Sequence, residues 1–139
     1  MNTEERARDN GKEDIDHLLA NKLNLFGQYL HNSYILPEWP DAIYNKYLVW
    51  NGVDKDNQGW HTDMFEDYDV FFLYYLDHTY KESGGAINFK WDGDCTASYQ
   101  PIAGDLFMIS NIRGFWHKAD DTKIKRRVCS FDYSTGRTE

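Results

Sequence analysis

Hydrophobic and polar positions along the chain follow two different periods. From Ile15 the apolar residues recur at spacings of three and four, which predicts a helix with one buried stripe formed by Leu18, Leu19, Leu23, Phe26 and Leu30. Asp14 is the residue expected to cap the start of this helix. Pro37 and Pro40 then end the helical pattern. We therefore expect one amphipathic helix ahead of the rest of the chain.

After Pro40 the pattern changes to short apolar or alternating runs separated by turn residues, which is typical of β-strands. We expect eight strands, near residues 43–50, 58–63, 69–77, 85–90, 97–101, 104–109, 114–118 and 127–133. Turn pairs such as Asn51-Gly52 and the run Asp92-Gly93-Asp94 separate them. The pattern predicts a mainly β fold, a double-stranded β-helix (jelly roll) with the N-terminal helix packed on one sheet.

Length and the N-terminal composition limit the organisation of the chain. A chain of 139 residues suits one domain, so we expect residues 14–139 to form a single domain behind a mobile polar leader of residues 1–13. The leader lacks the apolar core of a signal peptide, and no run has the length of a membrane span. We therefore expect an intracellular, cytoplasmic protein. The sequence leaves its oligomeric state open.

Charge and cysteine content exclude further classes of protein. The formal net charge is −8, and basic residues gather only in residues 123–127, which disfavours nucleic acid as a partner. The two cysteines, Cys95 and Cys129, form no C-x-x-C pair, so neither a disulfide framework nor a structural zinc site is expected.

Three residues have the chemistry of a metal site. His61 and Asp63 are two apart on a predicted strand, so their side chains point to the same face, and His117 follows downstream. Two histidines and one carboxylate form the facial triad of non-haem iron(II), which leaves positions open for a chelating 2-oxo acid and O₂. We therefore expect His61, Asp63 and His117 to bind Fe(II) and to be the catalytic centre.

Arg127 is expected to bind the far carboxylate of 2-oxoglutarate, because a guanidinium matches the fork geometry of a carboxylate. Arg126 competes for this role, since adjacent residues on a strand face opposite sides. We favour Arg127 because it shares a face with the more apolar set Cys129, Phe131 and Tyr133. Arg126 stays the alternative.

The order of motifs from about residue 58 to 133 resembles the Fe(II)/2-oxoglutarate-dependent dioxygenase superfamily. This order is H-x-D, a Gly-Gly strand, a Gly-Asp strand, histidine and arginine. Within the superfamily, Tyr74-Tyr75-Leu76-Asp77 followed by Ser83-Gly84-Gly85 resembles the Tyr-Tyr-Leu-Asn and Ser-Gly-Gly run of the prolyl-hydroxylase-like branch. The resemblance implies that Tyr75 also reaches the far carboxylate of 2-oxoglutarate; a packed strand aromatic is the alternative.

The resemblance implies an oxidoreductase that decarboxylates 2-oxoglutarate and hydroxylates a substrate C–H bond, with a prolyl or other peptide side chain as the first candidate. A free amino acid or small metabolite is the alternative substrate. Of other classes, a cupin-like metal hydrolase or isomerase would need neither Arg127 nor Tyr75, and a non-catalytic binding module would need no metal. Trp60 and Trp116 each precede a predicted ligand, and packing is favoured over substrate stacking for both.

Overall fold

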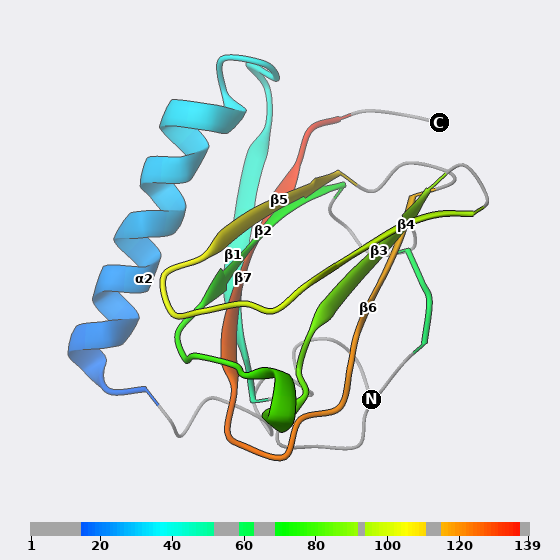
Figure 1. Ribbon diagram of the computed structural model, residues 1–139. Helices are drawn as coiled ribbons and strands as arrows, with labels where there is room; N and C mark the ends of the chain where they lie inside the picture. Colours follow the sequence, from blue (N-terminus) through cyan, green and yellow to red (C-terminus); the bar gives the residue numbers. More distant parts are fainter. Residues whose placement is uncertain (1–14, 52–58, 63–68, 92–93, 111–114, 137–139) are drawn as a thin grey trace.

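A computed structural model describes residues 15–51, 59–62, 69–91, 94–110 and 115–136 (Figure 1). The leader expected over residues 1–13, the helix cap expected at Asp14 and the metal ligand expected at Asp63 lie outside these residues. Within them, the chain forms one long helix and seven strands in two antiparallel sheets. The prediction of a mainly β fold with an N-terminal helix is confirmed.

Helix α2 (His17–Leu30) is the predicted amphipathic helix. It is capped by Asp16, whose carboxylate accepts a hydrogen bond of 2.8 Å from the backbone nitrogen of Leu19, so the cap lies two residues beyond the position expected. Leu23 is buried as predicted, but Leu18 is 63% exposed. The buried stripe is therefore narrower at its start than the apolar spacing suggested. A short π-helix, η2 (His31–Ile35), continues α2.

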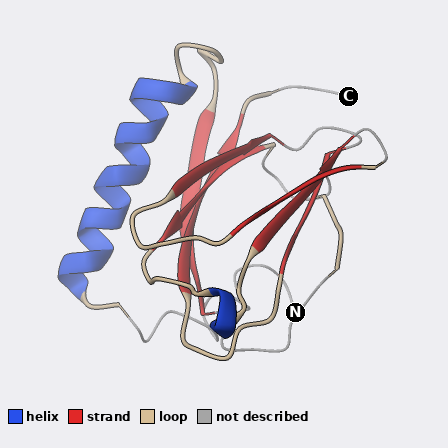
Figure 2. Cartoon of the chain, viewed as in Figure 1, coloured by secondary structure: helices blue, strands red, loops and turns tan. Residues whose placement is uncertain are grey.

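The strands form two sheets that lie as two layers in Figures 1 and 2. One has the order β1-β7-β2-β5, with bounds Ile43–Asn51, Arg127–Ser134, Val70–Tyr75 and Leu106–Ser110. The other has the order β4-β3-β6, with bounds Cys95–Tyr99, Ile87–Trp91 and Phe115–Ala119. The 3₁₀ helix η3 (Lys81–Ser83) lies between β2 and β3. Helix α2 covers the outer side of the four-stranded sheet (Figure 2).

Seven of the eight predicted strands are thereby confirmed, with shifts of at most two residues at their ends. The eighth, expected at 58–63, is described only over residues 59–62. There His61 forms an antiparallel bridge with His117 of β6. Backbone hydrogen bonds run in both directions, from His61 N to His117 O at 3.0 Å and from His117 N to His61 O at 2.9 Å. This segment therefore continues the three-stranded sheet beyond β6.

Helix α2 packs on β7 at Gly27, where a Cβ atom would lie 2.2 Å from the hydroxyl oxygen of Tyr44. The Tyr133 hydroxyl donates a hydrogen bond of 2.6 Å to the Gly27 carbonyl. Cys129, Phe131 and Tyr133 are fully buried in the cluster beneath the helix. Because side chains alternate along a strand, the residues between them on β7 face the other sheet. Strand β7 is therefore covered on both faces.

No helix in the described part of the chain combines the length and the apolar character needed to cross a membrane. Both cysteines are free thiols, with Cys95 exposed on β4 and Cys129 buried on β7.

Candidate functional site

Two of the predicted metal ligands lie side by side. The bridge between residue 61 and β6 places His61 and His117 directly opposite each other, with ring centroids 4.3 Å apart. The ring of His117 lies 5.6 Å from that of Phe71 on β2, and the residue is only 8% exposed. Since Phe71 belongs to the other sheet, the histidine pair faces the space between the sheets.

The backbone sets the orientation of the His61 ring. Its Nδ1 donates a hydrogen bond of 2.8 Å to the carbonyl oxygen of Gly59. An N–H at Nδ1 leaves the lone pair on Nε2, the arrangement by which a ligating imidazole is usually oriented toward a metal. Gly59 adopts a φ of +72°, a conformation that glycine reaches without steric cost. The local turn therefore fixes the orientation of the His61 ring through its Nδ1.

The third predicted ligand, Asp63, lies outside the described residues. Within the described ranges no group of three His, Cys, Asp or Glu side chains converges on one point. The other three histidines lie elsewhere: His17 is in helix α2, His31 Nε2 is 2.9 Å from the Ala42 carbonyl, and His78 is exposed. The described donor set is therefore a pair of imidazoles, which suits iron, zinc, copper or nickel.

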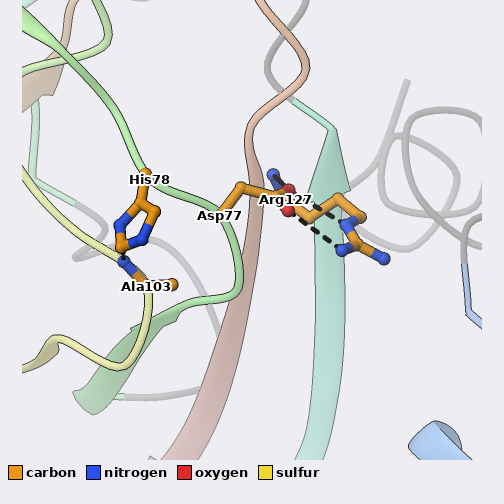
Figure 3. A network of polar contacts seen from close by, with 4 residues as sticks. All are labelled: Asp77, His78, Ala103 and Arg127. Carbon is orange, nitrogen blue, oxygen red and sulfur yellow. Dashed lines mark hydrogen bonds and ion pairs between the residues drawn. The ribbon is translucent and has the colours of Figure 1, made fainter.

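Arg127 is held by Asp77 at the start of β7 (Figure 3). The Asp77 carboxylate accepts hydrogen bonds of 2.9 Å from Nε and from Nη2 of Arg127, and one of 2.7 Å from its backbone nitrogen. These hydrogen bonds hold the pKa of Asp77 below its usual range. The bidentate pair ties the end of β2 to the start of β7, and by strand alternation Arg127 lies on the face shared with Cys129.

Arg126 points in the opposite direction, toward the second sheet. It is 9% exposed, and its Nη1 donates to the carbonyl oxygens of Gly85 at 3.2 Å and Asp120 at 3.4 Å, just before β3 and just after β6. Its buried Nε makes no hydrogen bond to any described residue. A buried cation with an unused donor is costly unless an anion binds beside it. Arg126, and not Arg127, is thus the arginine available between the sheets.

Tyr75 lies on the same interior face as Arg126. It pairs with Val128 across β2 and β7 and is 2% exposed. Burial raises the pKa of Tyr75 to about 12, against the opposing effect of the Arg126 charge and with a smaller contribution from the Asp105 carboxylate. The phenol is therefore protonated at neutral pH and can donate a hydrogen bond to an anion at Arg126. Its ring also packs edge-on against Phe107, at 5.8 Å between centroids.

The Ser83-Gly84-Gly85 run forms the backbone beside Arg126. Gly84 has a φ of +76°, and a Cβ there would lie 2.3 Å from the carbonyl oxygen of Asp121. Gly85 has a φ of +82°, and its Cβ would lie 3.4 Å from Nη1 of Arg126. The motif therefore lets the turn before β3 approach the segment that precedes Arg126, which a larger residue at position 84 would prevent.

Trp60 and Trp116 lie on the face of the three-stranded sheet opposite the histidine pair. Lys90 Nζ is 4.8 Å from the ring centroid of Trp60 and 6.0 Å from that of Trp116. Lys118 Nζ is 5.0 Å from the Trp60 centroid. These are cation–π contacts on the outer surface. Both tryptophans therefore contact lysine side chains on that face.

Solved structures with a similar fold include a member of the 2OG-Fe(II) oxygenase family and two prolyl hydroxylases. An oxidoreductase of the 2OG-Fe(II) oxygenase family from Burkholderia pseudomallei matches with a TM-score of 0.65 and 16% identity, over 83% of this chain and 55% of that chain. A prolyl hydroxylase from Trichoplax adhaerens, in complex with a peptide fragment of the hypoxia inducible factor oxygen degradation domain, matches with a TM-score of 0.60 and 18% identity. The match covers 68% of this chain and 45% of that chain. A Pseudomonas putida prolyl-4-hydroxylase matches with a TM-score of 0.59 and 13% identity, over 93% of this chain and 81% of that chain.

These similarities establish the fold, and the chain spans about half the length of the first two proteins. No family model matches the chain. A search of curated proteins finds no match either. The resemblance to the prolyl-hydroxylase-like branch, expected from the Tyr-Tyr-Leu-Asp and Ser-Gly-Gly run, is confirmed at the level of the fold.

Proposed function

We propose that the chain is an Fe(II)- and 2-oxoglutarate-dependent oxygenase that hydroxylates a substrate C–H bond. One observation carries the proposal. The histidine pair on β6 and its neighbouring segment, and the Arg126–Tyr75 pair on β7 and β2, face the same space between two sheets. A metal site and an anion site on one interior face are what a chelating dicarboxylate co-substrate requires.

The proposal includes the full jelly roll. The bridge at His61 supports an eighth strand beside β6, which would give each sheet four strands, in the orders β1-β7-β2-β5 and β4-β3-β6 followed by residues 58–63. In such a double-stranded β-helix the two sheets close around a central space. The histidine pair would then lie at the centre of the closed barrel.

His61, His117 and Asp63 would hold the iron. The described pair fits this role because the rings share a face, His117 is buried, and Gly59 fixes the tautomer of His61. Asp63 is two residues after His61, so it would point to the same face if the strand continues to it. An ionised Asp63 would supply the negative ligand that Fe(II) needs beside two neutral imidazoles.

We assign the far carboxylate of 2-oxoglutarate to Arg126, with Tyr75 as a second donor, in place of Arg127. The choice of Arg127 rested on the more apolar face of β7 being the interior one. In the structure that face lies under helix α2, and the Arg127 guanidinium is engaged by Asp77. Arg126 has the burial, the unused Nε donor and the neighbouring phenol that a bound carboxylate would satisfy.

The residues of the chain would bind and orient the reactants and keep water away from them. When bound, Fe(II) with O₂ and 2-oxoglutarate supplies the oxidising chemistry, giving succinate, CO₂ and one oxygen atom inserted into a C–H bond. The two charges of Fe(II) and the charge of Arg126 would balance Asp63 and doubly ionised 2-oxoglutarate, which limits the cost of burying them. Phe89 and Phe107, with ring centroids 6.1 Å apart, join the sheets and exclude water.

A peptide is the first substrate class to test, because two of the matching structures are prolyl hydroxylases and one of them holds a peptide fragment. Free amino acids and other small metabolites form the second class. The assay measures succinate released from 2-oxoglutarate, with mass spectrometry of the substrate for a gain of one oxygen atom. Peptide and amino-acid pools are tested separately.

Succinate release should require Fe(II) and should disappear in His117→Ala. Thermal unfolding of this variant in the metal-free state should confirm that it folds. A wild-type protein that releases no succinate with either pool, and no succinate without substrate, would contradict the oxygenase proposal. A hydrolase or isomerase with the same metal site would behave in that way, because it has no use for 2-oxoglutarate.

A further inference from the structure

Resting on the oxygenase function proposed above, we propose that Phe89, Phe115 and Trp91 form a stacking platform for the substrate. The platform would bind an uncharged ring-bearing side chain, prolyl or aromatic, next to the histidine pair. The three residues come from β3 and β6, the strands that carry His117 and its cross-strand neighbour.

The three rings form a continuous row. Phe89 stacks on Phe115 with centroids 5.8 Å apart and planes 28° from parallel. Phe115 stacks on Trp91 at 6.3 Å and 26°. Phe89 is the direct cross-strand partner of His117, and Trp91 is the partner of Phe115. Directly opposed residues share a face, so the row lies on the interior face with the histidine pair.

The row extends from His117 away from the proposed co-substrate site. Arg126 contacts Gly85 and Asp120, which precede β3 and follow β6. Trp91 is the last residue of β3 and Phe115 the first of β6, so the platform lies at the other end of the same two strands. With 2-oxoglutarate reaching from the metal to Arg126, the platform end is where a substrate can approach the metal.

The exposure of Trp91 identifies the outer end of the row. Its side chain is 38% exposed although it lies on the interior face, and its partner across β4, Cys95, is also exposed. Phe115 is two residues from His117 along β6, a distance of roughly 7 Å. A ring stacked on the platform would therefore lie beside the metal ligands, while the remainder of the substrate extends past Trp91.

The chemistry of the row determines the class of side chain. Stacked aromatic faces attract flat rings and the C–H groups of pyrrolidine, and aromatic-lined grooves bind proline-rich segments in the same way. No ionised side chain belongs to the row, and Lys90, which alternates with Phe89 and Trp91, lies on the outer face with Trp60. The platform therefore favours prolyl or aromatic side chains over acidic or straight aliphatic ones.

The test uses blocked pentapeptides that differ only in the central residue, which is proline, phenylalanine, leucine or glutamate, and the corresponding free amino acids. Succinate release gives kcat and KM for each compound. Trp91→Ala should raise KM for the best ring-bearing substrate roughly threefold to tenfold, the value of one stacking contact, with a smaller change in kcat. Trp91→Phe should restore most of the affinity.

Trp116→Ala is the matched control, because Trp116 is 39% exposed on the opposite face of the same sheet and pairs with Lys90. It should leave KM within about twofold of wild type. Substrate-free succinate release should be equal in all these proteins, and its absence from wild type would count against the oxygenase function itself. With that release present, equal effects of Trp91→Ala and Trp116→Ala, or no preference for a ring over leucine, would overturn the platform.

Discussion

Replacing Arg126 by alanine should weaken 2-oxoglutarate binding far more than replacing Arg127. The guanidinium of Arg126 is buried, and its Nε has no hydrogen-bond partner among the described residues. Losing one partner of a buried, hydrogen-bonded charge pair costs about 2–4 kcal/mol of binding free energy. At about 1.4 kcal/mol per factor of ten, the Kd should rise roughly 30-fold to 1000-fold. Arg126→Lys, which keeps the charge but not the fork, should give a smaller rise.

Arg127→Ala should act mainly on stability. The pair with Asp77 is bidentate, but the two side chains are 24% and 25% exposed, so solvent screens it. We expect a loss of about 1–2 kcal/mol in the free energy of unfolding, which lowers Tm by roughly 3–8 °C. Because Arg126 is the next residue, some loss of 2-oxoglutarate affinity can follow indirectly. Asp77→Ala removes the same ion pair while keeping Arg127, so it measures this indirect loss of 2-oxoglutarate affinity.

The assay is calorimetric titration of 2-oxoglutarate into the Fe(II)-loaded protein without oxygen, combined with thermal unfolding of each variant. Binding of the carboxylate by Arg126 requires a large rise in Kd for Arg126→Ala, and equal, small rises for Arg127→Ala and Asp77→Ala. This assignment is refuted if Arg127→Ala raises Kd well beyond Asp77→Ala while Arg126→Ala binds like wild type. The carboxylate would then bind on the helix-covered side of β7.

Three further predictions concern the residues around this site. Gly84→Ala should lower the free energy of unfolding by about 2–4 kcal/mol in chemical denaturation, because its Cβ would lie 2.3 Å from a backbone oxygen at a positive φ; Gly85→Ala, with nearest contacts of 3.4 Å, should cost clearly less. Asp77→Asn should be less stable than wild type at pH 7, and this difference in the free energy of unfolding should shrink as pH falls below about 4. The pKa of Asp77 is lowered in the folded state, so the stabilisation by its carboxylate is complete above the unfolded-state pKa and is lost when the carboxylate is protonated. Tyr75→Phe should raise the Kd of 2-oxoglutarate roughly threefold to tenfold, the value of one hydrogen bond, and equal binding would assign Tyr75 to packing alone.

Most of the fold could be predicted from the sequence because its periods are clear. The change from helical spacing to short strands at Pro40 located both the helix and the strand boundaries. The cap was placed at Asp14 because it precedes the first apolar residue, Ile15. The structure begins the helix at His17, where Asp16 can reach the backbone nitrogen of Leu19. The spacing of apolar residues does not decide which of two acidic residues this close together caps the helix.

The proximity of His61 and His117 was also expected from the order of motifs, whereas the side of β7 on which each arginine lies was not. On a strand with one buried face, the apolar set marks the interior. On β7 both faces are buried, and the apolar set, including Phe131, packs under the helix. One signal in the sequence was available for the Asp77–Arg127 pair: Asp77 is an acidic residue at the end of the Tyr-Tyr-Leu-Asp run, able to bind one of the two arginines.

The central proposal, a metal and 2-oxoglutarate site between the sheets, is tested most directly by spectroscopy. Anaerobic addition of Fe(II) and 2-oxoglutarate to the wild-type protein should produce a weak visible charge-transfer band from the chelate. The band should be lost in His61→Ala, His117→Ala and Asp63→Ala and should need much more 2-oxoglutarate in Arg126→Ala. A wild-type protein that binds Fe(II) but gives no band, or an Asp63→Ala variant that gives the full band, would contradict the proposal.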